Sequence, residues 1–138
     1  MLNLNAISLK KIKKASNIKG NINKILSIND PEYKGFGEIY TSIVKKDSVK
    51  AWKYHKKMTL NLTVIYGETK FVFFDGNRDF KSFNISSNDP HLLTVPPKLW
   101  YGFKSLNNND SLVLNFTNFI FNENEIERKN QDEIEFPW

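Results

Sequence analysis

The chain lacks cysteine entirely, and only two of its 138 residues are histidine. Without cysteine, neither a disulfide framework nor a thiolate metal site can form, and a reducing compartment is the simplest setting. No apolar run approaches the roughly 20 residues that span a bilayer, and the start of the chain has no apolar core long enough for a signal peptide. We therefore expect a cytoplasmic protein with no membrane partner.

Helical patterns are equally scarce. Only residues 123–128 have a helical pattern, and that segment is short. Short runs rich in β-branched and aromatic residues recur instead between turn signals such as Asp30-Pro31, Asp75-Gly76 and Pro96-Pro97. The predicted strands cover residues 21–28, 37–44, 49–56, 60–66, 69–75, 92–95, 100–105 and 111–119. This pattern predicts an all-β sandwich or barrel, and no repeat or linker divides residues 1–138 into more than one domain.

What the chain does contain is apolar and aromatic surface. Apolar residues make up 40% of the sequence and aromatic residues 14%, which is enough for a sizeable core in one domain. The 11 Phe, 5 Tyr and 3 Trp are more than one small core would hide, so we expect a homodimer. Trp100 and Phe103 are best interpreted as core or interface residues.

Positive charge is in excess but unevenly spread. The formal charge is +5, with lysines gathered in residues 10–14 and 45–57 and carboxylates in residues 123–135. No helix-turn-helix, zinc-finger or RNA-recognition pattern accompanies the lysines, so we expect no nucleic-acid partner. A few lysines would serve a smaller anion equally well, such as the pyrophosphate of a nucleotide-linked metabolite. The lysines of residues 10–14 are more simply a solvated face.

The segment around His55 carries most of the functional information. With the period of two that is typical of a strand, Lys53, His55 and Lys57 share one face and Trp52 and Tyr54 share the other. Burying such a polar face in a closed core would require desolvating each ammonium group. The pattern therefore predicts that this strand lines a cavity.

Three segments resemble a known family: residues 37–75, residues 93–106 with PPKLWYGFK, and residues 111–128 with EIER. They are similar to the small cupins of the dTDP-4-dehydrorhamnose 3,5-epimerase superfamily and the related dTDP-sugar 3,4-ketoisomerases. The resemblance implies a single-domain jelly-roll, usually dimeric. It also implies a cofactor-independent epimerase or ketoisomerase that acts on a nucleotide-linked 4-keto-6-deoxy sugar in making surface polysaccharide.

The chain departs from this family at several positions. The resemblance places Lys53 where the epimerases have a catalytic histidine, and His55 where the ketoisomerases have the second histidine of a His-x-His pair. Leu60 stands at the position of an epimerase lysine, and Asn115 at about the position of a catalytic tyrosine. The resemblance also implies an aspartate partner for the histidine, in a C-terminal segment that we expect this chain to lack.

A metal site is not expected. Metal-dependent cupins need a His-x-His pair, a nearby glutamate and a later histidine. Here Lys53 replaces the first histidine and Tyr101 stands at the position of the last one. His91, the other histidine, follows Asp89-Pro90 and is most simply a solvated turn residue. We predict that the protein binds neither a metal nor any other cofactor.

The predicted catalytic residues are His55 and Lys53. Moving a proton beside a ketone needs a base near neutrality and a group that stabilises the enolate. His55 supplies the base without tuning, whereas Lys53 would act mainly as a charged partner of the keto oxygen. The alternative is a histidine that is hydrogen-bonded inside the barrel without a chemical role.

Other polar residues of the expected barrel are candidates for substrate binding, because polar groups inside a barrel usually meet a ligand. These candidates are Glu38, Tyr40, Lys50, Asn61, Thr63, Tyr101 and Asn115. Lys50 could meet a phosphate or be solvated, and the side chains of Glu38, Tyr40, Asn61 and Thr63 could equally lie on the outer face. A second hypothesis remains open: a cupin with impaired catalysis that binds a sugar nucleotide or acts as a scaffold for a partner enzyme.

Overall fold

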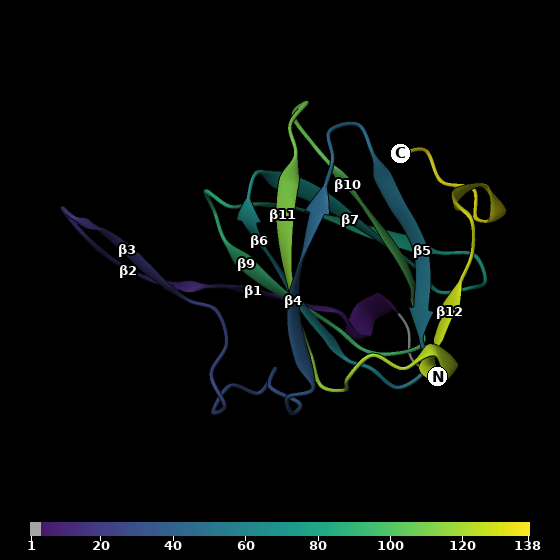
Figure 1. Ribbon diagram of the computed structural model, residues 1–138, viewed down its shortest axis with the longest axis horizontal. Coiled ribbons are helices and arrows are strands. Elements are labelled where there is room, and N and C mark those ends of the chain that lie inside the picture. The colour runs from purple at the N-terminus through teal and green to yellow at the C-terminus, as the bar shows by residue number, and fades with distance from the viewer. Residues whose placement is uncertain (1–3) are drawn as a thin grey trace.

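The structure, a computed structural model, describes residues 4–138 and consists almost entirely of antiparallel strands (Figure 1). The strands are β1 (Ser8–Lys11), β2 (Lys13–Asn17), β3 (Gly20–Lys24), β4 (Glu38–Val44), β5 (Val49–His55), β6 (Leu60–Tyr66), β7 (Glu68–Phe74), β8 (Phe80–Ser86), β9 (His91–Val95), β10 (Trp100–Ser105), β11 (Ser111–Thr117) and β12 (Ile126–Arg128). Three short 3₁₀ helices join them: η1 (Leu4–Ala6), η2 (Glu123–Glu125) and η3 (Gln131–Glu133). The predicted all-β sandwich is confirmed.

Two five-stranded sheets form the body of the molecule. The first has the strand order β1-β9-β6-β11-β4, and the second has the order β12-β5-β10-β7-β8. The main core lies between them, where Leu60 and Leu62 of β6 pack in one cluster with Phe71 and Phe73 of β7. Each such side chain contributes about 1.5–3 kcal/mol when fully buried. Because side chains alternate along a strand, the residues between them on β6 point to the outer face of the first sheet.

β12 pairs with β5 at the edge of the second sheet. Ile126 lies opposite His55, and Arg128 lies opposite Lys53. The helical pattern predicted for residues 123–128 is therefore wrong for its second half, because only η2 turns and the rest of the segment is extended. The open edge of β5 supplies the hydrogen-bonding partners that favour a strand here. This pairing brings the end of the chain to the histidine strand.

The outer face of the second sheet carries a separate apolar cluster. Trp52 of β5 and Trp100 of β10 are buried there together with Ile134, which follows η3. The rings of Trp52 and Trp138 are 5.3 Å apart, and the indole nitrogen of Trp52 donates to the backbone oxygen of Gln131. Trp100 thus belongs to this outer cluster, whereas Phe103 lies in the main core. The chain after β12 covers the outer side of the strand that carries His55.

Some strands were not expected from the sequence. β8 pairs with β7 as an edge strand, and β1 pairs with β9 at the edge of the first sheet. β2 and β3 pair only with each other and form a hairpin, the arm (residues 13–24), which extends away from the body (Figure 1). The strand expected at residues 21–28 is shorter, because β3 ends at Lys24. Within residues 4–138 no helix has the length and hydrophobicity needed to cross a membrane.

Candidate functional site

The candidate site is a cleft between the two sheets, made of two adjoining chambers. The His55 chamber, of about 240 Å³, is lined by Glu38, Tyr40, Lys53, His55, Met58, Tyr101, Phe121 and Ile126. The Asn115 chamber, of about 60 Å³, is lined by Tyr40, Ser42, Lys50, Lys53, Leu62, Tyr101, Phe103, Val113 and Asn115. Three residues, Tyr40, Lys53 and Tyr101, line both chambers. The strand with Lys53 and His55 thus borders a cavity, as its pattern predicts.

His55 is buried and hydrogen-bonded at both ring nitrogens. Its Nδ1 lies 2.5 Å from Oε1 of Glu125, and its Nε2 lies 3.1 Å from the hydroxyl oxygen of Tyr101. A carboxylate can only accept a hydrogen bond, so in the neutral imidazole Nδ1 carries the proton and Nε2 keeps its lone pair. Tyr101 then donates to Nε2. The lone pair that could remove a proton therefore points toward a residue that lines both chambers.

Glu125 is the partner of the histidine that the sequence did not reveal. Its other oxygen, Oε2, accepts hydrogen bonds from the backbone N–H groups of Lys57 and Met58, at 3.0 and 3.1 Å. Burial by itself raises the pKa of Glu125, but these hydrogen bonds and the interaction with His55 bring its pKa below the usual value. The carboxylate is therefore charged at neutral pH. It is fixed in position from two sides.

The acidic partner of His55 differs in type and position from the aspartate that the resemblance implies for the epimerases. The resemblance pointed to an aspartate beyond the matched segments, whereas the structure supplies a glutamate within them, 70 residues after His55. The sequence feature that indicates Glu125 is the EIER motif, in which it is the first residue. A strand there, paired with β5, would place Glu125 at the end of the histidine strand.

The protonation of His55 is governed by its burial. Burial lowers the pKa of His55, and the hydrogen bond and charge of Glu125 offset this only in part. Lys53 and Arg128 lower the pKa further through repulsion. The imidazole is therefore neutral at physiological pH, which is the state that a general base requires.

Lys53 lies beside His55 on the same wall of the cleft. Burial lowers the pKa of the Lys53 ammonium, and repulsion from Arg128 and Lys50 adds to this effect. Lys50 points its Nζ at the hydroxyl of Ser42, 2.9 Å away, in the Asn115 chamber. The three cations favour an anionic ligand at this end of the cleft, because an anion would relieve their mutual repulsion.

The opposite wall, from the first sheet, carries a tyrosine and an asparagine in contact. Asn115 of β11 and Tyr40 of β4 are cross-strand neighbours, and Nδ2 of Asn115 donates to the Tyr40 hydroxyl over 2.8 Å. Burial raises the pKa of Tyr40, although this hydrogen bond lowers it in part. Oδ1 of Asn115 is buried and, among residues 4–138, has no hydrogen-bond partner. Because buried acceptors are nearly always satisfied, this oxygen favours a ligand with a donor group.

Two predicted substrate ligands lie elsewhere. The side chains of Asn61 and Thr63 point to the outer face of the first sheet, away from the cleft. Asn61 donates to the backbone oxygen of Glu32 and accepts from Thr94, and Thr63 donates to the backbone oxygen of His91. The polar groups of Asn61 and Thr63 are hydrogen-bonded to other groups of the same chain, so neither residue belongs to the candidate site. The other seven candidates all line the cleft.

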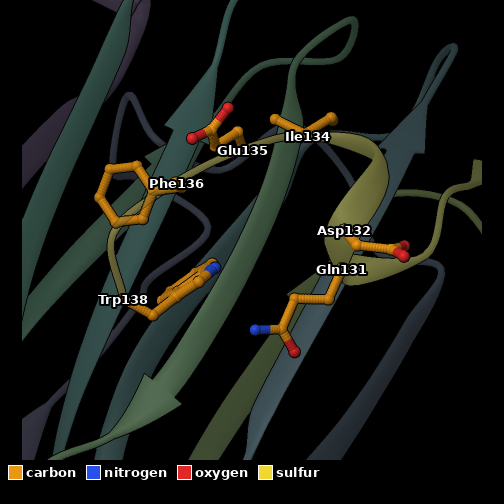
Figure 2. Close-up of a pocket in the computed structure, with 6 residues that line it drawn as sticks. All are labelled: Gln131, Asp132, Ile134, Glu135, Phe136 and Trp138. Carbon is orange, nitrogen blue, oxygen red and sulfur yellow. The ribbon is translucent and has the colours of Figure 1, made fainter.

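A second hollow lies over the C-terminal segment. It measures about 500 Å³ and is lined by six residues of the segment after β12, with Phe136 and Trp138 at one end and Gln131 and Asp132 at the other (Figure 2). Its titratable side chains are the carboxylates of Asp132 and Glu135. Neither a histidine nor a lysine is among the residues that line it. The cleft around His55 therefore remains the candidate active site. Within residues 4–138, no group of three or more His, Asp or Glu side chains could hold a metal ion.

Comparison with known proteins places this fold and cleft in one class. The sequence matches no protein-family model and no curated protein. Among solved structures, a dTDP-sugar isomerase from Desulfovibrio desulfuricans G20 is similar with 30% identity and a TM-score of 0.86, covering 92% of this chain and 85% of that one. The 3,4-ketoisomerase QdtA of Thermoanaerobacterium thermosaccharolyticum, in complex with TDP, has 20% identity and a TM-score of 0.78, covering 95% and 93%.

A more distant neighbour is the RmlC epimerase of Mycobacterium tuberculosis, with 13% identity and a TM-score of 0.81, covering 93% of this chain and 70% of that one. At that level of identity the likeness concerns the fold alone. The match to the Desulfovibrio protein is closer and spans nearly the whole of both chains. The chain belongs to the family of dTDP-sugar isomerases, in keeping with the sequence resemblance.

Proposed function

We propose that this protein is an epimerase or ketoisomerase of a dTDP-linked 4-keto-6-deoxy sugar, and that it works without a cofactor. The observation that carries the proposal is the buried His55, which Glu125 holds with its Nε2 lone pair toward the cleft. Both reactions begin when a base removes the proton on a carbon next to the ketone. The membership of the family supports the same substrate class.

In the proposed reaction, Nε2 of His55 takes the proton from the carbon beside the keto group. The electron pair moves onto the keto oxygen and forms an enolate. A neutral imidazole in the right tautomer contributes about 10²–10⁴-fold to such a step. Glu125 stabilises the imidazolium that forms, because its carboxylate is charged and in contact with Nδ1. When the substrate enters, Tyr101 must release its hydrogen bond to Nε2.

The developing negative charge would be stabilised by Lys53 and by the Tyr40 hydroxyl. Tyr40 accepts its hydrogen bond from Asn115, so its own proton is free to point at the keto oxygen. Preorganised donors of this kind stabilise an enolate more than water does. The unpaired Oδ1 of Asn115 would accept from a sugar hydroxyl. Lys50 and Arg128 would attract the diphosphate.

One observation favours the second hypothesis, a cupin that binds the sugar nucleotide with impaired catalysis. The first histidine of the ketoisomerase pair is replaced by Lys53, which lines both chambers. A lysine at this position could preserve the affinity for the sugar nucleotide, although the base that the first histidine would supply is missing.

We also propose that the protein works as a homodimer and in the cytoplasm.

The test of the proposed function is solvent exchange. The protein is incubated in heavy water with dTDP-4-keto-6-deoxyglucose, and incorporated deuterium and the product are followed by mass spectrometry and NMR. We expect exchange with the wild-type protein and a loss of about 10²–10⁴-fold in His55→Asn, because the base is removed while the ligand still binds.

His91→Asn is the matched control, because His91 lies on β9 and its Nδ1 contacts the backbone oxygen of Asp89, away from the cleft. It should exchange deuterium like the wild type. If the wild-type protein binds the sugar nucleotide without any exchange, the binding hypothesis replaces the enzymatic one. If His55→Asn exchanges normally, another base is at work.

A further inference from the structure

Lys53 is a lysine of the cleft that has no partner. Its side chain is accessible and lines both chambers. In the part of the chain that the structure describes, its Nζ makes neither a hydrogen bond nor an ion pair. Lys50 lies on the same strand and in the same cleft, but its Nζ donates to the hydroxyl of Ser42 over 2.9 Å. A ligand that enters either chamber therefore meets, in Lys53, an amine that has no contact of its own to give up.

The surroundings of Lys53 favour a nucleophilic amine. Although the side chain is accessible, desolvation by the protein around it lowers the pKa of the ammonium, and repulsion from Arg128 and Lys50 lowers this pKa further. Only the uncharged amine has the lone pair that attacks a carbonyl carbon. Partial desolvation and a neighbouring cation are the two features that activate a lysine for such an attack. Both features are present around Lys53.

The carboxylates on this side of the cleft have other partners. Glu38 accepts a hydrogen bond from the backbone N–H of Phe121. Glu125 contacts Nδ1 of His55 and two backbone N–H groups. Among residues 4–138, neither carboxylate forms an ion pair with Lys53. Neither one therefore holds the lysine in its charged form.

The position of Lys53 on β5 suits a ketone whose neighbouring carbon is at His55. The two residues are one position apart, so their Cα atoms are separated by roughly 7 Å along the strand and both side chains border the His55 chamber. A sugar ring can present two adjacent carbons to them, the keto carbon to Lys53 and the carbon beside it to His55. The flexible four-carbon stem of the lysine lets Nζ adjust to the keto carbon.

We propose that Lys53 forms a covalent bond with the substrate, in which its amine condenses with the keto carbon to an iminium ion. The inference rests on the proposed function, because it needs a keto sugar in the cleft. The ammonium first attracts the keto oxygen, and the bond then replaces this contact. The electron pair of the proton transfer ends on the nitrogen of Lys53 rather than on the keto oxygen.

The condensation is balanced without any further reactant. The ammonium gives one proton to Nε2 of His55, and the lone pair of the resulting amine attacks the keto carbon. A second proton passes from the nitrogen to the oxygen, His55 returns the first proton to that oxygen, and the C–O bond breaks. Of the three protons of the ammonium, one stays on nitrogen and two leave with the keto oxygen as water. The positive charge stays on the nitrogen.

The iminium then serves the proton transfer. Nε2 of His55 takes the proton from the carbon beside the iminium, the C–H electrons form a C=C bond, and the C=N electrons move to the nitrogen of Lys53. The product of this step is an enamine. A proton that returns to the same carbon from the opposite wall inverts that carbon and restores the iminium. Water then adds to the iminium and releases the ketone and the lysine.

A bond to Lys53 selects epimerisation over ketoisomerisation. In ketoisomerisation the returning proton would go to the carbon that holds the nitrogen. The ketone would then form on the neighbouring carbon, which carries a hydroxyl, and Lys53 would stay attached through an ordinary C–N single bond. Water does not hydrolyse such an amine, so the enzyme would be lost after one turnover. Only the return of the proton to its own carbon frees the lysine.

The first test is trapping of the iminium. The full-length protein is mixed at neutral pH with dTDP-4-keto-6-deoxyglucose and sodium cyanoborohydride, which reduces an iminium far faster than a ketone. Intact mass and peptide mapping then locate the adduct. We expect one sugar nucleotide per chain, attached to Lys53 and not to Lys50. The absence of an adduct at Lys53 would overturn the proposal.

Lys53→Arg separates a bond from a charge. The guanidinium keeps the positive charge but does not condense with a ketone, so this variant should lose the adduct and most of the deuterium exchange. Lys70→Arg is the matched control, because Nζ of Lys70 lies 5.2 Å from the ring of Phe136, which belongs to the apolar cluster on the outer face of the second sheet. It should keep both the adduct and the exchange. Exchange at the wild-type rate in Lys53→Arg would overturn the covalent step.

Two readouts separate this inference from the proposed function. Exchange without an adduct at Lys53 would refute the bond and leave the proposed function in place. An adduct without exchange would support the bond and contradict the proposed function. The product, followed by NMR, should keep its ketone at the original carbon, with inversion beside it. A ketone that moves to the neighbouring carbon with repeated turnover would overturn the proposal, because Lys53 would have remained attached.

Discussion

Replacing Glu125 by glutamine is the most direct probe of the site. The change keeps the size of the side chain and removes its charge. Oε2 of Glu125 accepts two backbone hydrogen bonds, from Lys57 and Met58, and Oε1 accepts one from Nδ1 of His55. The oxygen of a glutamine will therefore face the two backbone N–H groups, and its NH₂ group will face His55.

This arrangement reverses the tautomer of His55. An NH₂ group can only donate, so Nδ1 must become an acceptor, and the proton of the neutral imidazole moves to Nε2. The lost charge-assisted hydrogen bond alone is worth about 1.5–3 kcal/mol, or about 10- to 150-fold in rate. Because the Nε2 lone pair is also lost, we expect the whole contribution of a general base to disappear, about 10²–10⁴-fold.

The assay is deuterium exchange as a function of pH. The base must be neutral, and burial holds the pKa of His55 below its ordinary value of about 6.5. Wild-type exchange should therefore be constant at neutral pH and fall on acidification through the lowered pKa. Glu125 raises the pKa of His55. In Glu125→Gln the fall of the exchange rate on acidification, the acid limb, should therefore occur at a still lower pH, and the constant rate at neutral pH, the plateau, should be lower than in the wild type.

Glu127→Gln is the matched control, since Glu127 is the exposed neighbour on β12. It should leave both the plateau and the acid limb unchanged. An exchange rate in Glu125→Gln within about threefold of the wild type would refute the assigned tautomer. An acid limb that moved to higher pH would show that the coupling of the two groups is wrong.

Two further predictions concern Lys53 and Gly37. Lys53→Met should weaken both ligand binding and exchange, because a charge aimed at the keto oxygen acts in the ground state and the transition state alike. Lys53→His should separate the two functional hypotheses: a gain of exchange indicates a binder that lacks its base, and a loss indicates that Lys53 is part of a working site. Gly37→Ala should destabilise the protein by about 1–3 kcal/mol in urea unfolding, because a Cβ there would lie 2.1 Å from the carbonyl carbon of Phe119. Thr41→Ala, at an exposed position of β4, the strand that begins directly after Gly37, is its control, and equal unfolding midpoints for the two variants would contradict the packing argument.

The sequence alone determined the fold class and half of the site. Short apolar and aromatic runs between turn residues can only bury their side chains as a sandwich of strands, so the all-β architecture was predictable. The period of two around His55 also predicted that Lys53 and His55 point into a cavity, since alternation is a local property of a strand.

Other features could not be predicted because they depend on contacts between distant segments. Asn61 and Thr63 alternate as a ligand-binding pair would, but which face of β6 meets the core depends on how the sheets pack. The edge strands β1 and β8 have weak local patterns, and pairing with β9 and β7 stabilises them.

Glu125 is the clearest example of a feature that depends on contacts between distant segments. Its segment has a helical pattern, and its partner His55 lies 70 residues earlier. Only the pairing of β12 with β5 brings the two together, because it places Ile126 opposite His55 and so puts the preceding residue at the end of the histidine strand. The sequence therefore determined that a histidine faces a cavity, and the tertiary structure decided which carboxylate holds it and which nitrogen is the base.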